Sequence, residues 1–232
     1  MTHTLSQKSR RKLLRNFLYP AGGLVGFMLI CEGLARSGLA PSVLVPIPSQ
    51  VPFALMSEIK NGSYFPMIGH SLQHYALGVL LGSLFGISLG IVCGLSTTTD
   101  QILAWVLRVL RPIPSIAWIP FSIIWFGIGE GAAAFVISIS VFWLNFFASY
   151  VAVKSVEPDY LEMAAAFGHR GWSARVFKII IPSASPGIMG GIRSSLGQGW
   201  MAVVAAELFG VTGVGMRLNE AAGLLATNVV LL

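Results

Sequence analysis

Residues 72–95 read LQHYALGVLLGSLFGISLGIVCGL, an apolar run with a glycine at every fourth position from residue 78 onward. The run contains no Asp, Glu, Lys or Arg, and it exceeds the roughly 20 apolar residues that a helix needs to cross a bilayer. Its glycines lie on one helical face, where another helix can approach closely. They are Gly78, Gly82, Gly86, Gly90 and Gly94. This stretch therefore predicts a membrane-spanning helix packed along its length on a second helix.

The whole chain has the composition of a membrane protein. Of its 232 residues 55% are hydrophobic and 10% are charged, whereas soluble domains carry about 25% charged residues. Further apolar stretches lie at about 17–37, 112–128, 132–153 and 180–209, and a sixth begins near Thr227. We expect an all-α, polytopic transmembrane helical bundle with five full spans plus the start of a sixth, the last one incomplete in the given sequence.

Basic residues indicate the orientation. Residues 1–16 hold five Lys and Arg residues and no acidic one, and such a segment before an apolar run stays on the cytoplasmic side. Segments 96–111 and 154–178 carry six more basic residues and are expected on the same side. We therefore expect a basic cytoplasmic tail over 1–16, a transmembrane domain over 17–232, and a cytoplasmic N-terminus. Nucleic-acid binding by the tail is disfavoured because the apolar segment follows at once.

The segment 155–178 is expected to contain a short helix between two spans. Pro158 suits a first helical position, Asp159 and Glu162 favour the N-terminal end of the helix dipole, and Gly168 suits the helix end. A helix of about ten residues is marginal by itself. We therefore expect it to require a partner surface, as helices bound in grooves do.

The same segment carries a family resemblance. Glu162-Met163-Ala164-Ala165-Ala166-Phe167-Gly168, followed by Ile179-Ile180-Ile181-Pro182, resembles the EAA loop of binding-protein-dependent ABC transporter permeases. Met163 departs from the family's alanine, and the interval from Gly168 to Pro182 is one residue longer than usual. Residues 111–120, 125–130, 205–207 and 45–49 are similar to the nitrate, sulfonate and taurine branch, and the match covers about 40–232.

The resemblance implies a type-I-like ABC importer permease in the cytoplasmic (inner) membrane. In that family the coupling helix sits in a cleft of the ATPase subunit and carries its motion to the membrane. The residues that this assigns to ATPase coupling are Glu157, Asp159, Glu162, Ala164, Ala165, Gly168, His169, Arg170 and Trp172.

Partners and solute also follow from the resemblance. It implies a homodimer with a second permease copy, two ATP-binding subunits, an external solute-binding protein and surrounding membrane lipid. The chain has no Gly-x-x-x-x-Gly-Lys-Ser/Thr loop, so no cofactor is expected in it, and ATP and Mg belong to the partner ATPase. The expected solute is a small anion such as nitrate, bicarbonate, taurine or an aliphatic sulfonate. The alternatives are a pyrimidine-type or aromatic nutrient, or a membrane subunit or channel that is not coupled to ATP. An intramembrane enzyme lacks a nucleophile–base constellation.

Two expected spans offer candidates for the solute pathway. Ionisable residues within spans are costly and usually face a cavity or a partner. Two interpretations stay open: one face of span 180–209 lines the pathway, or its charges pair with other spans, for example Arg193 with Glu32. Asn145 in span 132–153 is more typical of an interhelical hydrogen bond. The pathway candidates are Trp143, Asn145, Arg193, Gln198, Trp200, Met201 and Glu207.

His70 and His74 lie four residues apart and would suit a metal by spacing alone. No nearby cysteine or carboxylate completes a ligand set. We therefore expect ordinary interfacial histidines and no metal site.

Overall fold

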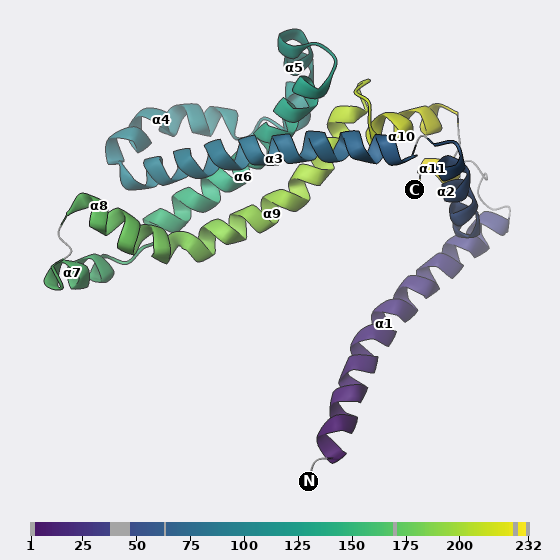
Figure 1. The fold of residues 1–232 in the computed structure, drawn as a ribbon, viewed down its shortest axis with the longest axis horizontal. Helices are drawn as coiled ribbons and strands as arrows, with labels where there is room; N and C mark the ends of the chain where they lie inside the picture. The colour runs from purple at the N-terminus through teal and green to yellow at the C-terminus, as the bar shows by residue number, and fades with distance from the viewer. Residues whose placement is uncertain (1–2, 38–46, 63, 169–170, 225–226, 231–232) are drawn as a thin grey trace. The chain divides into compact units, whose positions relative to one another are not determined.

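A computed structural model describes residues 3–37, 47–62, 64–168, 171–224 and 227–230, which form helices and turns with no strand among them. The chain divides into two units, Met1–Tyr64 with Leu218–Leu232, and Phe65–Arg217. Figure 1 shows the ribbon of each unit. The expected all-α fold with long apolar helices is confirmed.

The first unit is built on a single long helix. Helix α1 (His3–Arg36) runs without a break from the expected basic tail into the apolar stretch Leu18–Arg36. Its end is joined to η1 (Pro48–Gln50), because the Glu32 carboxylate accepts hydrogen bonds from Arg36 Nε at 2.7 Å and Ser49 Oγ at 2.8 Å. Helices α2 (Val51–Lys60) and α11 (Thr227–Val230) contact each other in the same unit.

The second unit is a bundle of three long helices, α3 (Tyr64–Leu95), α6 (Glu130–Lys154) and α9 (Ile181–Glu207), which run side by side (Figure 1). The glycine face of α3 lies directly on α6. A Cβ atom added to Gly82 would lie 2.5 Å from the carbonyl oxygen of Ser138, and one on Gly90 would lie 2.5 Å from that of Phe146. Only glycine permits this approach of two backbones.

Helix α9 packs on another face of α6 through two more glycines. Cβ atoms at Gly187 and Gly191 would lie 2.7 Å and 2.4 Å from the Cβ atoms of Ala152 and Ala148. The outward face of α3 exposes large apolar side chains, including Leu80 and Phe85. An apolar exterior around a tightly packed interior is what a helix bundle in lipid requires.

Leu18–Arg36, Tyr64–Leu95 and Glu130–Lys154 are the described helices that are long and apolar enough to cross a membrane. Helix α9 is 27 residues long, or about 40 Å, and corresponds to the span expected at 180–209. The multi-pass architecture follows, and the total of five spans plus the start of a sixth stays a prediction.

The expected single span over 112–128 is wrong in detail. Helix α4 (Thr97–Leu110) precedes a non-helical break at 111–114, and η2 (Ser115–Trp118) and α5 (Ile119–Phe126) follow it. Pro112 and Pro114 explain the break, since proline lacks the backbone N–H and disfavours a helical conformation in the residue before it. The first turn of α4 is attached to the end of α6, because Asp100 accepts hydrogen bonds from Tyr150 at 2.9 Å and Lys154 at 2.5 Å.

The segment after α6 holds three short helical pieces. Helices α7 (Pro158–Ala166) and α8 (Trp172–Arg175) are followed by a π-helical turn, η3 (Val176–Ile180), which leads into α9. A π-helix closes its hydrogen bonds over one residue more than an α-helix. We attribute the one-residue lengthening between Gly168 and Pro182 to this turn.

Candidate functional site

The short helix expected in the coupling segment is present as α7. Glu157 is its N-cap with an extended backbone, Pro158 is the first helical residue, and Asp159 lies in the first turn. The chain leaves the helix at Gly168, whose φ of +86° is a conformation that residues with a Cβ rarely adopt. Local sequence thus determines both ends of the helix, as the caps predicted.

Large apolar side chains are exposed in α7, just after its end, and at the start of α8. The exposed fractions are 55% for Met163, 80% for Phe167 and 70% for Trp172. Glu162 is exposed beside them, whereas Ala164 and Ala165 are half-buried. Several large apolar side chains exposed on one short segment are typical of a protein-binding surface. His169 and Arg170, also assigned to coupling, lie outside the described residues.

A hollow separates α7 and α8 from the ends of α3 and α6. Its volume is about 520 Å³, and it is lined by Gly94, Leu95, Val153 and Lys154 on the bundle side and by Leu161, Trp172, Arg175, Val176 and Ile180 among the linking residues. The α7–α8 segment is therefore not packed closely against the bundle along its whole length.

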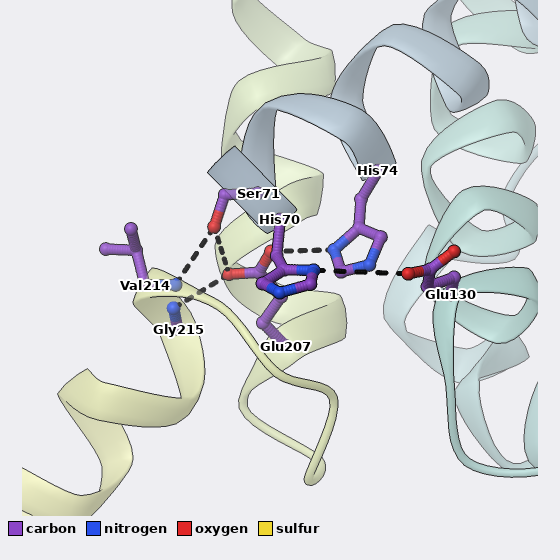
Figure 2. Close-up of polar contacts among 7 residues, drawn as sticks. All are labelled: His70, Ser71, His74, Glu130, Glu207, Val214 and Gly215. Atoms are coloured by element: carbon purple, nitrogen blue, oxygen red, sulfur yellow. Dashed lines mark hydrogen bonds and ion pairs between the residues drawn. The ribbon is translucent and has the colours of Figure 1, made fainter. Parts of the chain in front are cut away.

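At the opposite end of the bundle a buried carboxylate joins three helices (Figure 2). Glu207, the last residue of α9, is fully buried. Its Oε2 accepts hydrogen bonds from Ser71 Oγ at 2.9 Å and from the Gly215 amide at 2.8 Å, and its Oε1 lies 3.0 Å from His74 Nδ1. Ser71 Oγ also accepts the Val214 amide at 2.9 Å. The cluster connects α3, α9 and the start of α10 (Val214–Gly223).

The two histidines of α3 have different partners (Figure 2). His74 is 1% exposed, so the expectation of an ordinary interfacial histidine is wrong for this residue. Its Nδ1 faces Glu207, and its Nε2 is buried without a hydrogen-bond partner among the described residues. His70 lies 4.0 Å from Glu130 in a more exposed position. The two rings thus do not share a ligand.

The α9 candidates other than Glu207 lie on an exposed face. Arg193, Gln198, Trp200 and Met201 are all exposed, and no described carboxylate lies within ion-pair distance of Arg193. Glu32 binds Arg36 and Ser49 instead. Because lipid does not tolerate an unpaired charge cheaply, such a face requires water or another protein subunit.

The two α6 candidates occupy the interior. Asn145 is fully buried and donates a hydrogen bond from Nδ2 to Ser83 Oγ at 2.9 Å. This contact is the interhelical bond that an amide in an apolar span favours. Trp143 is half-buried and stacks on Phe147, with ring centroids 6.1 Å apart.

Sequence reasoning missed the partners of these residues. Ser71 precedes the glycine stripe of α3 by seven residues, and Ser83 follows Gly82. A signal for Ser71 was available. Ser71, His74 and Gly78 are three and four positions apart, which places them on the same face of the helix, and all three are buried. The amides of Val214 and Gly215 left no signal, because any residue but proline supplies such a donor.

These features define a multi-pass membrane protein, namely a helix bundle with exposed apolar side chains on a linking segment and exposed polar side chains on a membrane-length helix. Residues 78–231 match the family described as the inner membrane component of binding-protein-dependent transport systems. The chain belongs to this family, and its relatives place it in the nitrate, sulfonate and taurine branch.

Three relatives illustrate the similarity. The taurine transport system permease protein TauC of Escherichia coli is 32% identical over 99% of this chain and 85% of its own. The protein named "Putative aliphatic sulfonates transport permease protein SsuC", of Bacillus subtilis, is 30% identical over 96% of this chain and 79% of its own. The bicarbonate transport system permease protein CmpB of Synechocystis is 30% identical over 93% of this chain and 80% of its own.

The fold is also shared with a solved transporter. An inward-facing structure of the MetNI methionine ABC transporter matches with a TM-score of 0.62 at 17% identity, covering 72% of this chain and 86% of that one. A second crystal form of the same transporter matches with a TM-score of 0.63 at 18% identity, covering 75% of this chain and 89% of that one. At this identity the likeness concerns the fold alone.

Proposed function

We propose that this permease imports a small anion in an ATP-driven complex with two ATPase subunits, a second permease copy and an external solute-binding protein. The relatives are named for taurine, aliphatic sulfonates and bicarbonate, and a further one for nitrate. Each of these solutes carries an oxyanion group. The N-terminus and the α7–α8 segment face the cytoplasm in this proposal, in keeping with their basic residues.

The exposed apolar side chains of the α7–α8 segment carry the proposal. Met163 lies in the nine-residue α7, which is too short to be stable alone, Phe167 directly follows α7, and Trp172 begins α8. A groove in the ATPase that accepts these side chains would order the helix and bury them. Since η3 continues directly into α9, a displacement of this segment would act on the helix that carries Arg193 and Glu207.

Co-purification tests the docking. Glu162→Arg and Gly168→Trp change the exposed side and the positive-φ end of α7, so we expect the ATPase subunit to be lost from the purified complex. Glu130→Arg is the control. It makes the same charge reversal at the first residue of α6, the end of that helix far from α7. Retention of a stable ATPase by both α7 variants would contradict the proposal and favour a subunit that is not coupled to ATP.

Reconstitution tests the solute class. The permease, its ATPase and its binding protein are placed in nanodiscs, and ATP hydrolysis is measured with nitrate, bicarbonate, taurine, longer alkanesulfonates and a neutral pyrimidine. We expect stimulation by one of the anions. Stimulation by the pyrimidine alone would overturn the anion assignment while leaving the importer in place.

A further inference from the structure

A groove on α6 contains a cation, Arg111, that the pathway candidates did not include. The groove has a volume of about 690 Å³ and is open at the surface of the helix bundle. It is lined by Arg111, Trp143, Leu144, Phe147, Ala148, Val151, Ala152, Ser155 and Gly187. Among the described residues of that lining, Arg111 is the only charged one.

Arg111 lies at the break between α4 and η2. Its guanidinium stands 4.3 Å from the centre of the Phe147 ring. Phe147 precedes Lys154, the end of α6, by seven residues, which is roughly 10 Å along the helix. The cation thus lies beside a membrane-length helix, inward from its end.

Arg111 is not neutralised by the described part of the chain. No described carboxylate lies within ion-pair distance of it, and Asp100, at the start of α4, is bound to Lys154 and Tyr150 instead. Trp143 stacks on Phe147, so the two rings form an aromatic wall of the groove next to the guanidinium. The Trp143 indole N–H is buried without a hydrogen-bond partner among the described residues, so the wall also holds an unsatisfied donor.

We infer that this groove binds the transported solute through its oxyanion group, with Arg111 as the charge partner and Phe147 and Trp143 as the apolar wall. Charge complementarity selects the occupant, because a guanidinium without a described carboxylate partner attracts an anion, and its planar fork suits a sulfonate, carboxylate or nitrate group. Helix breaks within membrane-embedded segments are also where transporters bind their solutes. Because the solute class follows from the proposed import of a small anion, this assignment rests on the proposed function.

The test uses the fluorescence of Trp143 in the full permease in nanodiscs of zwitterionic lipid. The chain has six tryptophans, so the signal of Trp143 is the difference from the matching Trp143→Phe protein. Iodide is the anionic quencher and acrylamide the neutral one, at constant ionic strength. We expect iodide to quench Trp143 efficiently, and taurine, nitrate or bicarbonate to suppress that quenching in a saturable way.

Arg111→Gln should weaken this suppression about tenfold or more, as expected when a charge-assisted hydrogen bond is lost, while acrylamide quenching stays unchanged. Arg111→Lys keeps the charge and should retain part of the effect, which guards against misfolding of the glutamine variant. Lys60→Gln removes one positive charge on α2 and is the control. Equal protection in Arg111→Gln and the parent protein would overturn the assignment.

Lipid is the other source of an oxyanion. If anionic phospholipid in the nanodisc suppresses iodide quenching and none of the three solutes does, the groove holds a lipid headgroup and the assignment is wrong. Failure of the ATP hydrolysis experiment together with saturable solute protection would instead contradict the proposed import and leave the site standing. The two proposals therefore fail in different measurements.

Discussion

Replacing Gly90 by alanine should destabilise the bundle, although the same change in an uncrowded helix stabilises it. A Cβ atom at Gly90 would lie 2.5 Å from the carbonyl oxygen of Phe146 and 2.9 Å from Ser149 Cβ. Favourable contacts between such atoms begin at about 3.5 Å, so α3 and α6 would have to separate by about 1 Å. Overpacking of this kind costs about 1–3 kcal/mol.

Gly190 supplies the matched control. It lies inside α9, and a Cβ there would meet nothing within 4 Å. Alanine is better than glycine in a helix by up to about 1 kcal/mol, and this gain applies equally at both positions. The difference in unfolding free energy between Gly90→Ala and Gly190→Ala therefore isolates the packing cost and should be about 1–3 kcal/mol.

Reversible unfolding in mixed micelles, with increasing sodium dodecyl sulfate and helicity measured by circular dichroism, gives the two free energies. Gly82→Ala should behave like Gly90→Ala, because its Cβ would lie 2.5 Å from the Ser138 carbonyl oxygen. Stabilisation of the Gly90 and Gly82 variants as large as that of Gly190→Ala would refute the direct contact of α3 and α6 backbones.

Three other predictions concern the polar contacts and the coupling segment. His74→Ala leaves the buried Glu207 Oε1 without its 3.0 Å contact to the ring Nδ1, and an unmade buried hydrogen bond costs about 1–3 kcal/mol, so the same unfolding assay should show a loss of about that size. Asp100→Asn weakens the contact with Lys154, a partly exposed pair that water screens, so only a small loss of stability is expected; a loss as large as that of Gly90→Ala would show that the pair controls the placement of α4. Gly168→Ala places a Cβ at a φ of +86°, which costs about 1 kcal/mol, and should raise the proteolysis rate of the α7–α8 segment without changing bundle stability.

Features governed by short stretches of sequence were predictable. The four-residue spacing of glycines on α3 corresponds to its contact face with α6, and Glu157, Pro158 and Gly168 lie at the ends of α7 as their preferences indicate. Each of these features depends on one helix or one turn. Periodicity and capping report such features because the residues involved are neighbours in the chain.

Pairings between distant segments were not predictable in the same way. Glu207 stood out as an ionisable residue near the end of a span, but its partner Ser71 is separated from it by 136 positions. Hydropathy identifies helices without saying which of them are neighbours. The sequence therefore left open whether Glu207 lines a pathway or pairs with another helix, and its fully buried contacts with α3 and α10 favour the second interpretation.

Arg111 shows how counting basic residues depends on where the helices begin and end. Counting basic residues in the segments between apolar stretches is a reliable guide to orientation, and Arg111 was counted with segment 96–111. That count assumes that the apolar stretch starting at Pro112 is a complete span. With α4 helical up to Leu110 and attached to the end of α6 through Asp100, the break falls further along α6, beside Phe147. Because no described carboxylate lies within ion-pair distance of Arg111 at that position, its charge is available to the anion that we propose for the groove.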